Sequence, residues 1–164
     1  MKLGHASPLL LVLGLAACGH SPRPYTFDTP RPNGEALDLL ARGLQQDGHQ
    51  ISRVDKQRGE IVTYWENTGY RFRETDDLEH ETTIFLRYHV SVAGTGDDRR
   101  VSLTADVQRC AADSAMITPR EVIGTCLKMD VILPSHQKVL DRLGQHLSGT
   151  LASAQPVSRS PSGG

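Results

Sequence analysis

Two long stretches of apolar–polar alternation in the middle of the chain constrain its fold more than any other feature. They run over residues 82–92 and 99–109, with two glycines in the segment between them. A period of two is typical of a half-buried strand, and two such strands joined by a glycine-containing loop form an antiparallel hairpin. The apolar face of this predicted hairpin carries Ile84, Leu86, Tyr88, Val90, Val101, Leu103, Ala105 and Val107.

The register and the second face of the hairpin follow from the same alternation. Pairing Val90 with Val101 sets apolar residues opposite one another and makes residues 93–98 the loop. A slip of one residue would move charged side chains into the core, so the facing of each strand is well specified. Cross-strand polar pairs explain most of the other face, but a large phenylalanine there does not fit a purely solvated surface. The candidate partner face therefore consists of Phe85, Arg87, His89, Thr104 and Asp106.

Helical periodicity flanks the strands on both sides. Asn33 is a good N-cap for a first helix that ends at Gly48, and Pro134 begins a second helix. Shorter strands are expected at residues 49–55, 60–66 and 127–131, with a further short one at 70–73. The order predicts an α+β fold in which an N-terminal and a C-terminal helix pack on one face of an antiparallel sheet of about five strands. The two apolar helical stripes are Leu37, Leu40, Ala41 and Leu44, and Val139, Leu140, Leu143 and Leu147.

The start of the chain resembles a bacterial lipoprotein signal peptide. A positive residue, Lys2, precedes the apolar run 9–15, and Leu15-Ala16-Ala17-Cys18 is similar to a lipobox. The apolar run is shorter than the roughly 20 residues that span a bilayer. The resemblance implies that residues 1–17 are removed and that Cys18 carries a diacylglyceryl group, which anchors the protein to a membrane. Gly19, in place of an aspartate, implies the outer membrane, with the domain facing the periplasm.

Two cysteines remain once Cys18 is assigned to lipid. In an exported domain Cys110 and Cys126 most simply form a disulfide, which would contribute about 3 kcal/mol. A redox or metal pair is the alternative, but there is no C-x-x-C motif and no histidine spacing typical of a zinc site.

Composition along the chain indicates four segments. Residues 1–17 are the signal peptide, and residues 18–32 form a proline-rich tether that could hold the domain roughly 40 Å from the lipid. Residues 33–151 form the α+β domain. Residues 152–164, rich in serine, proline and glycine, are predicted to be a disordered tail.

No chemical motif predicts an enzyme. The chain has 18 basic and 19 acidic residues, which is not the balance of a nucleic-acid-binding protein. It contains neither a Gly-x-Ser-x-Gly motif nor a glycine-rich phosphate loop. We therefore expect no catalytic residues, no metal and no cofactor. The densest group of ligand types is interpreted as a solvated acidic loop and comprises Asp76, Asp77, Glu79, His80 and Glu81.

The segment from Leu37 to Trp65 resembles the start of small envelope lipoprotein domains such as the BamC-type subunits of the outer-membrane β-barrel assembly machinery. In those domains a helix precedes a strand that ends in aspartate, here Asp55, followed by a turn with glycine, here Gly59, and a second strand. The resemblance implies a helix-grip-like fold and a binding role. The expected function is a non-enzymatic interaction or structural module with an envelope protein partner. The alternative is an envelope enzyme or small-ligand carrier whose pocket, between sheet and helices, is lined by Trp65 and Tyr88.

Overall fold

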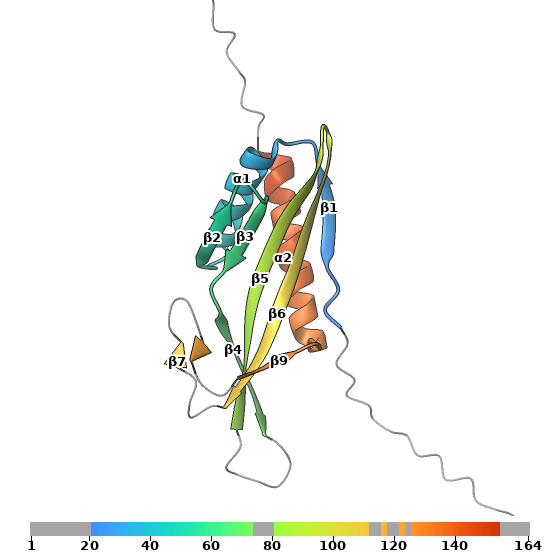
Figure 1. The fold of residues 1–164 in the computed structure, drawn as a ribbon. Helices are drawn as coiled ribbons and strands as arrows, with labels where there is room; N and C mark the ends of the chain where they lie inside the picture. Colours follow the sequence, from blue (N-terminus) through green and yellow to red (C-terminus); the bar gives the residue numbers. More distant parts are fainter. Residues whose placement is uncertain (1–20, 74–80, 112–115, 118–121, 124–125, 155–164) are drawn as a thin grey trace, which may run out of the picture.

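The structure is a computed structural model that describes residues 21–73, 81–111, 116–117, 122–123 and 126–154 (Figure 1). The acidic loop predicted around residues 76–81 lies outside the described residues, apart from the backbone of Glu81. The elements are β1 (Tyr25–Thr29), α1 (Asn33–Gln46), β2 (Ile51–Asp55), β3 (Glu60–Thr63), β4 (Glu66–Arg73), β5 (Glu81–Thr95), β6 (Asp98–Ala111), β7 (Met116–Ile117), β8 (Val122–Ile123), β9 (Cys126–Met129) and α2 (Pro134–Ser153).

The long antiparallel hairpin of β5 and β6 is the spine of a seven-stranded sheet (Figure 1). Near the hairpin turn, β1 pairs with β6 on one side, while β3 and then β2 extend the sheet from β5 on the other. Toward the open end of the hairpin, β4 pairs with β5 and β9 pairs with β6. β7 and β8 pair only with each other. The sheet thus has two halves with different edge strands on one shared hairpin.

Both helices cover the same face of the sheet, which confirms the predicted α+β class and helix placement. The sheet has seven strands where about five were expected, because the prediction missed β1 and counted the short strand at residues 70–73 only as an option. The apolar stripes of the two helices meet the alternating apolar face of β5 and β6 in one core. Its fully buried members include Leu37, Leu40, Leu44, Ile61, Val101, Leu103, Leu140 and Leu147.

The register of the central hairpin differs from the predicted one by two residues. Val90 lies opposite Leu103, whereas it was expected opposite Val101. The strands run on to Thr95 and Asp98, so the connection is a two-residue turn and the predicted loop at residues 93–98 is wrong. A shift of two leaves every side chain on its predicted face, because the side-chain period of a strand is also two.

The predicted tether, residues 18–32, is wrong for its second half. Residues 25–29 form β1, which pairs with residues 99–103 of β6. The ring of Tyr25 lies directly over Gly144 of α2, where an added Cβ would come within 2.2 Å of Tyr25 Cδ1. Upstream, the backbone of Arg23 is hydrogen-bonded to the side chain of Gln137 in α2. The folded domain therefore begins near residue 23, ten residues before the expected start.

The predicted strand at residues 60–66 is interrupted. β3 ends at Thr63, and β4 begins at Glu66 after a break at Tyr64 and Trp65. This break sends Trp65 to the face of the sheet opposite the helices, whereas Ile61 of β3 lies in the main core. At the C-terminal end, α2 continues to Ser153. Among the described residues, none of the helices is long and apolar enough to cross a bilayer.

Candidate functional site: the helix-free face of the sheet

A second, smaller apolar cluster lies on the face of the sheet that the helices leave free. It comprises Trp65, Phe85 and Cys110, with Cys126 packed against it. Phe85 is only 1% exposed. Its proposed place on a partner-contacting surface is therefore wrong, because Trp65 and the cysteines cover its ring. Phe85 instead packs inside the cluster, under Trp65 and the two cysteines.

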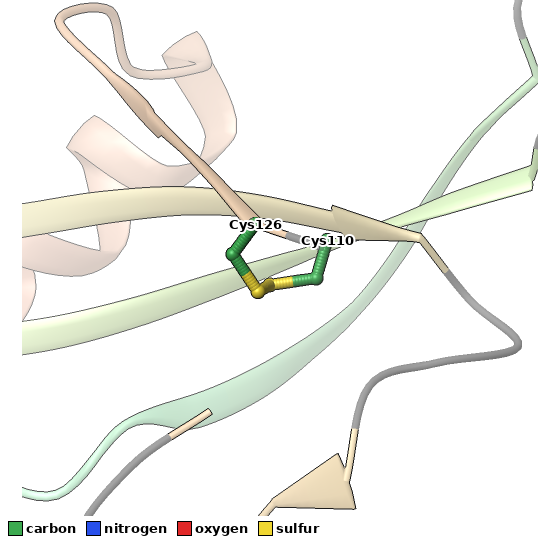
Figure 2. Close-up of a disulfide and its surroundings, with 2 residues drawn as sticks. All are labelled: Cys110 and Cys126. Carbon is green, nitrogen blue, oxygen red and sulfur yellow. A yellow bond between two sulfur atoms is a disulfide. The ribbon is translucent and has the colours of Figure 1, made fainter. Parts of the chain in front are cut away.

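The predicted disulfide is present in this cluster (Figure 2). Cys110 near the end of β6 and Cys126 at the start of β9 are directly opposite one another in the pairing of these strands, with their Cα atoms 4.1 Å apart. Figure 2 shows the bond on the side of the sheet away from α2. It ties the short edge strand β9 to the spine and closes the loop between residues 110 and 126.

Beside the cluster, Arg87, His89 and Asp106 form a compact polar group. Arg87 and Asp106 are cross-strand partners, and the guanidinium Nη2 of Arg87 donates to Oδ2 of Asp106 at 2.6 Å. Nε2 of His89 lies 2.8 Å from the same oxygen. The guanidinium of Arg87 also lies over the ring of Trp65, 4.5 Å from its centroid. One carboxylate thus holds two donors, and the tryptophan fixes the plane of one of them.

The electrostatics of Asp106 follow from these contacts. Partial burial of Asp106 alone would raise its pKa. The hydrogen bonds and positive charge of Arg87 and His89 outweigh this effect, and the pKa of Asp106 lies below its ordinary value. Asp106 is therefore a carboxylate at neutral pH and keeps the group in one geometry.

Four of the five predicted face residues come together as a partly exposed surface. The side chains of Arg87, His89 and Asp106 are 32%, 36% and 31% exposed, and Thr104 lies opposite His89 in the next cross-strand pair. Sequence reasoning missed Trp65 at this site. The sequence around it, Thr63-Tyr64-Trp65-Glu66, contains no glycine or proline that would indicate the break between β3 and β4. We call Trp65, Arg87, His89, Thr104 and Asp106 the polar face.

A separate polar contact lies at the border of the main core. Nδ1 of His49 lies 2.9 Å from both carboxylate oxygens of Glu66, and the His49 ring packs edge-on against Tyr88. Burial, with a smaller contribution from the charge of Glu66, raises the pKa of Tyr88 to about 12. Tyr88 belongs to the helix-side core and Trp65 to the second cluster, so they do not line a common pocket. The pocket expected between sheet and helices on these two residues was wrong.

An open groove lies at the far end of the molecule, where α1 begins and α2 ends. Arg31 is one of the residues that line it. Its guanidinium donates to the carbonyl oxygen of Leu151 at 2.9 Å, to that of Ala154 and to the carboxylate of Glu35. These bonds satisfy carbonyls that the end of α2 leaves without helical partners. Arg31 in this groove therefore acts as a helix cap for the end of α2.

Within the described ranges, no three His, Cys, Asp or Glu side chains lie close enough together to hold a metal ion. The polar face offers hydrogen-bond donors and one compensated carboxylate, which suits recognition of a polar surface.

Comparison with known proteins finds only distant similarity to solved structures. No family model and no curated protein matches this sequence. Among solved structures, a DUF4468 family protein from Bacteroides ovatus is similar, with 12% identity, a TM-score of 0.44 and coverage of 89% of this chain and 95% of that one. A TBP-like protein from Parabacteroides distasonis is similar with 8% identity, a TM-score of 0.46 and coverage of 82% and 94%.

Proposed function

We propose that this protein is a lipid-anchored lipoprotein of the bacterial envelope, held through Cys18 and facing the periplasm from the outer membrane. Its α+β domain acts as a non-enzymatic interaction module that binds an envelope protein through the polar face. The lipobox-like segment Leu15–Cys18 supports the anchor. The prearranged group of Arg87, His89 and Asp106 supports the binding role, and it is the single observation that carries the proposal.

The geometry of the polar face favours binding over catalysis. Arg87 and Asp106 compensate each other's charge, so an approaching partner does not have to neutralise a bare ion. Their side chains are already ordered by Trp65 and by the strand pairing, which reduces the entropy lost on association. Arginine is also among the residue types that contribute most at protein interfaces, and Arg87 is partly exposed while the buried ring of Trp65 supports it.

The anchor is tested by replacing the lipobox cysteine. Cys18→Ser is expected to move the protein from the membrane fraction to the soluble fraction of the envelope. Continued sedimentation with membranes after this change would refute the anchor.

The binding face is tested by placing a photo-crosslinking amino acid at Thr104, with the same substitution at Val54 as the matched control. Val54 is also partly exposed but lies on β2, at an edge of the sheet. We expect one discrete crosslinked species from position 104, none from position 54, and loss of that species in Arg87→Glu. Equal crosslinking from both positions, or none from either, would refute the polar face as the binding surface.

A further inference from the structure

Four large apolar side chains are exposed around the start of α2. Tyr70 of β4 packs edge-on against the ring of His136 in the first turn of α2, with 5.3 Å between ring centroids. Val131 lies three residues before the start of this helix, Val139 lies in its second turn, and Leu127 lies on β9. Tyr70, Leu127, Val131 and Val139 are 47%, 59%, 37% and 42% exposed, and we call these four residues the apolar end.

The apolar end lies on the helix-covered side of the sheet, away from the polar face. Leu127 pairs with Arg109, and Arg109 pairs with Ile84, a member of the main core. Residues directly opposite one another in a sheet project to the same face, so Leu127 projects to the side of the helices. Figure 1 shows that the lower parts of β5 and β6 continue past the start of α2, which leaves this side of the sheet without a helix there.

The N-terminal segment leaves the domain at this same end. The backbone N–H of Arg23 donates to Oε1 of Gln137 at 3.0 Å, and Nε2 of Gln137 donates to the carbonyl oxygen of Arg23 at 3.1 Å. Gln137 is 97% buried and lies two residues before Val139. In Figure 1, β1 and α2 both begin at this end of the molecule. The chain is therefore fixed to the fold beside the apolar end.

The remaining distance to the lipid is short. Arg23 lies only five positions after Cys18, and a fully extended chain covers at most about 3.5 Å per residue. The Cα atom of Arg23 can thus lie no more than about 18 Å from that of Cys18. This is less than half of the separation that a tether of residues 18–32 would allow.

We propose that the apolar end rests on the membrane surface, so that its occupant is the lipid bilayer itself. The inference rests on the proposed function, because it needs the acyl chains on Cys18. A short link keeps the apolar end at a high effective concentration beside the lipid, so weak contacts suffice to orient the domain. Leucine and valine side chains enter the boundary between headgroups and acyl chains, and a tyrosine ring suits the headgroup level.

Apolar contact is the main attraction in this arrangement. Lys128 and Lys138 adjoin Leu127 and Val139 in the sequence, and Asp130 adjoins Val131. The mixed charge gives no strong pull toward anionic lipid, so binding should depend little on salt. In this orientation the turn of the β5–β6 hairpin points away from the bilayer, and the polar face stays open to the side.

Depth-dependent quenching of tryptophan tests the inference. The lipidated full chain is reconstituted into vesicles of phosphatidylethanolamine and phosphatidylglycerol, with and without brominated phosphatidylcholine. Leu127→Trp and Val139→Trp are compared with Val54→Trp. Val54 is 38% exposed but lies on β2, the edge strand beside β3 and away from β9. Trp65 is present in all variants and supplies the same background. Thermal unfolding of each variant checks that the fold is retained.

We expect brominated lipid to cause a loss of emission in Leu127→Trp and Val139→Trp that is absent in Val54→Trp. Quenching equal to that of the control, in protein that remains on the vesicles, would overturn the docking while leaving the lipid anchor intact. Emission that changes with protein concentration and not with brominated lipid would assign the apolar end to a second copy of the chain, and would also overturn it. Protein that carries no lipid and leaves the vesicles would refute both proposals.

Discussion

Removal of the disulfide measures how firmly the lower half of the sheet is held. Cys110 and Cys126 lie sixteen residues apart in the sequence. In the chain-entropy model, a crosslink that closes a loop of this length lowers the conformational entropy of the unfolded chain and so stabilises the folded protein by about 3 kcal/mol. Cys110 is also fully buried against Trp65 and Phe85, so replacement by alanine leaves unfilled space worth about 1 kcal/mol more.

Cys110→Ala/Cys126→Ala is therefore expected to lower the free energy of unfolding by about 4 kcal/mol, which for a domain of this size lowers Tm by about 15 °C. The measurement is guanidinium chloride unfolding of the mature chain in a Cys18→Ser background. The emission of Trp65, the chain's one tryptophan, follows the transition because its ring belongs to the affected cluster.

The unsubstituted cysteine pair under reducing conditions is the matched control, since it loses the crosslink but keeps both sulfur atoms. It should lie about 1 kcal/mol above the double alanine variant and about 3 kcal/mol below the oxidised protein. The reasoning is refuted if the double variant unfolds within 1 kcal/mol of the oxidised protein, or if two thiols react in the denatured, unreduced protein.

Three further predictions concern single side chains of the main fold. Gly144→Ala should destabilise the domain by about 1–3 kcal/mol, because the new Cβ would meet the ring of Tyr25. Gly149→Ala, which has open space at its position, should be neutral or stabilising. Equal changes in Tm for the two variants would contradict this reasoning. Arg31→Met should cost about 2 kcal/mol in chemical unfolding, because carbonyls in the last turn of α2 lose a charged donor, and full rescue by Arg31→Lys would argue against the forked contact. The pKa of Tyr88 is about 12 in the folded protein and 10 in the unfolded chain. Its contribution to the free energy of unfolding is therefore fully present below pH 10 and falls by up to about 3 kcal/mol as the pH rises toward 12. Tyr88→Phe should remove this pH dependence, and parallel curves of unfolding free energy against pH for the variant and the unsubstituted protein would refute its assignment to Tyr88.

The faces of the central hairpin could be predicted from sequence because a strand's period of two is a local property. Its register could not, because moving Val90 from Val101 to Leu103 leaves the same residues in the core. Only the conformation of the turn distinguishes the two alternatives. Gly96 adopts a positive φ of 66° there, which permits the tight connection.

β1 and the second cluster depended on contacts between distant parts of the chain. Tyr25 and Phe27 alternate with polar residues, but the prolines around this short run indicate a tether when no partner strand is known. Phe85 looked exposed because the sheet face around it is polar. Its burial depends on Trp65, which reaches that face only because the chain breaks between β3 and β4.

The position of β1 has a consequence for the order in which the chain can fold. β1 is the first strand of the domain in the sequence, but its neighbours are β6 and α2, which belong to the second half of the chain. The hairpin of β5 and β6 can form locally, whereas docking of β1 requires closing a loop across most of the domain. Until then part of the edge of β6 remains unpaired and able to accept a strand from another molecule. A chain truncated before α2 should therefore be more prone to aggregate through that edge, because β1 would keep its pairing with β6 but lose the contact of Tyr25 with α2.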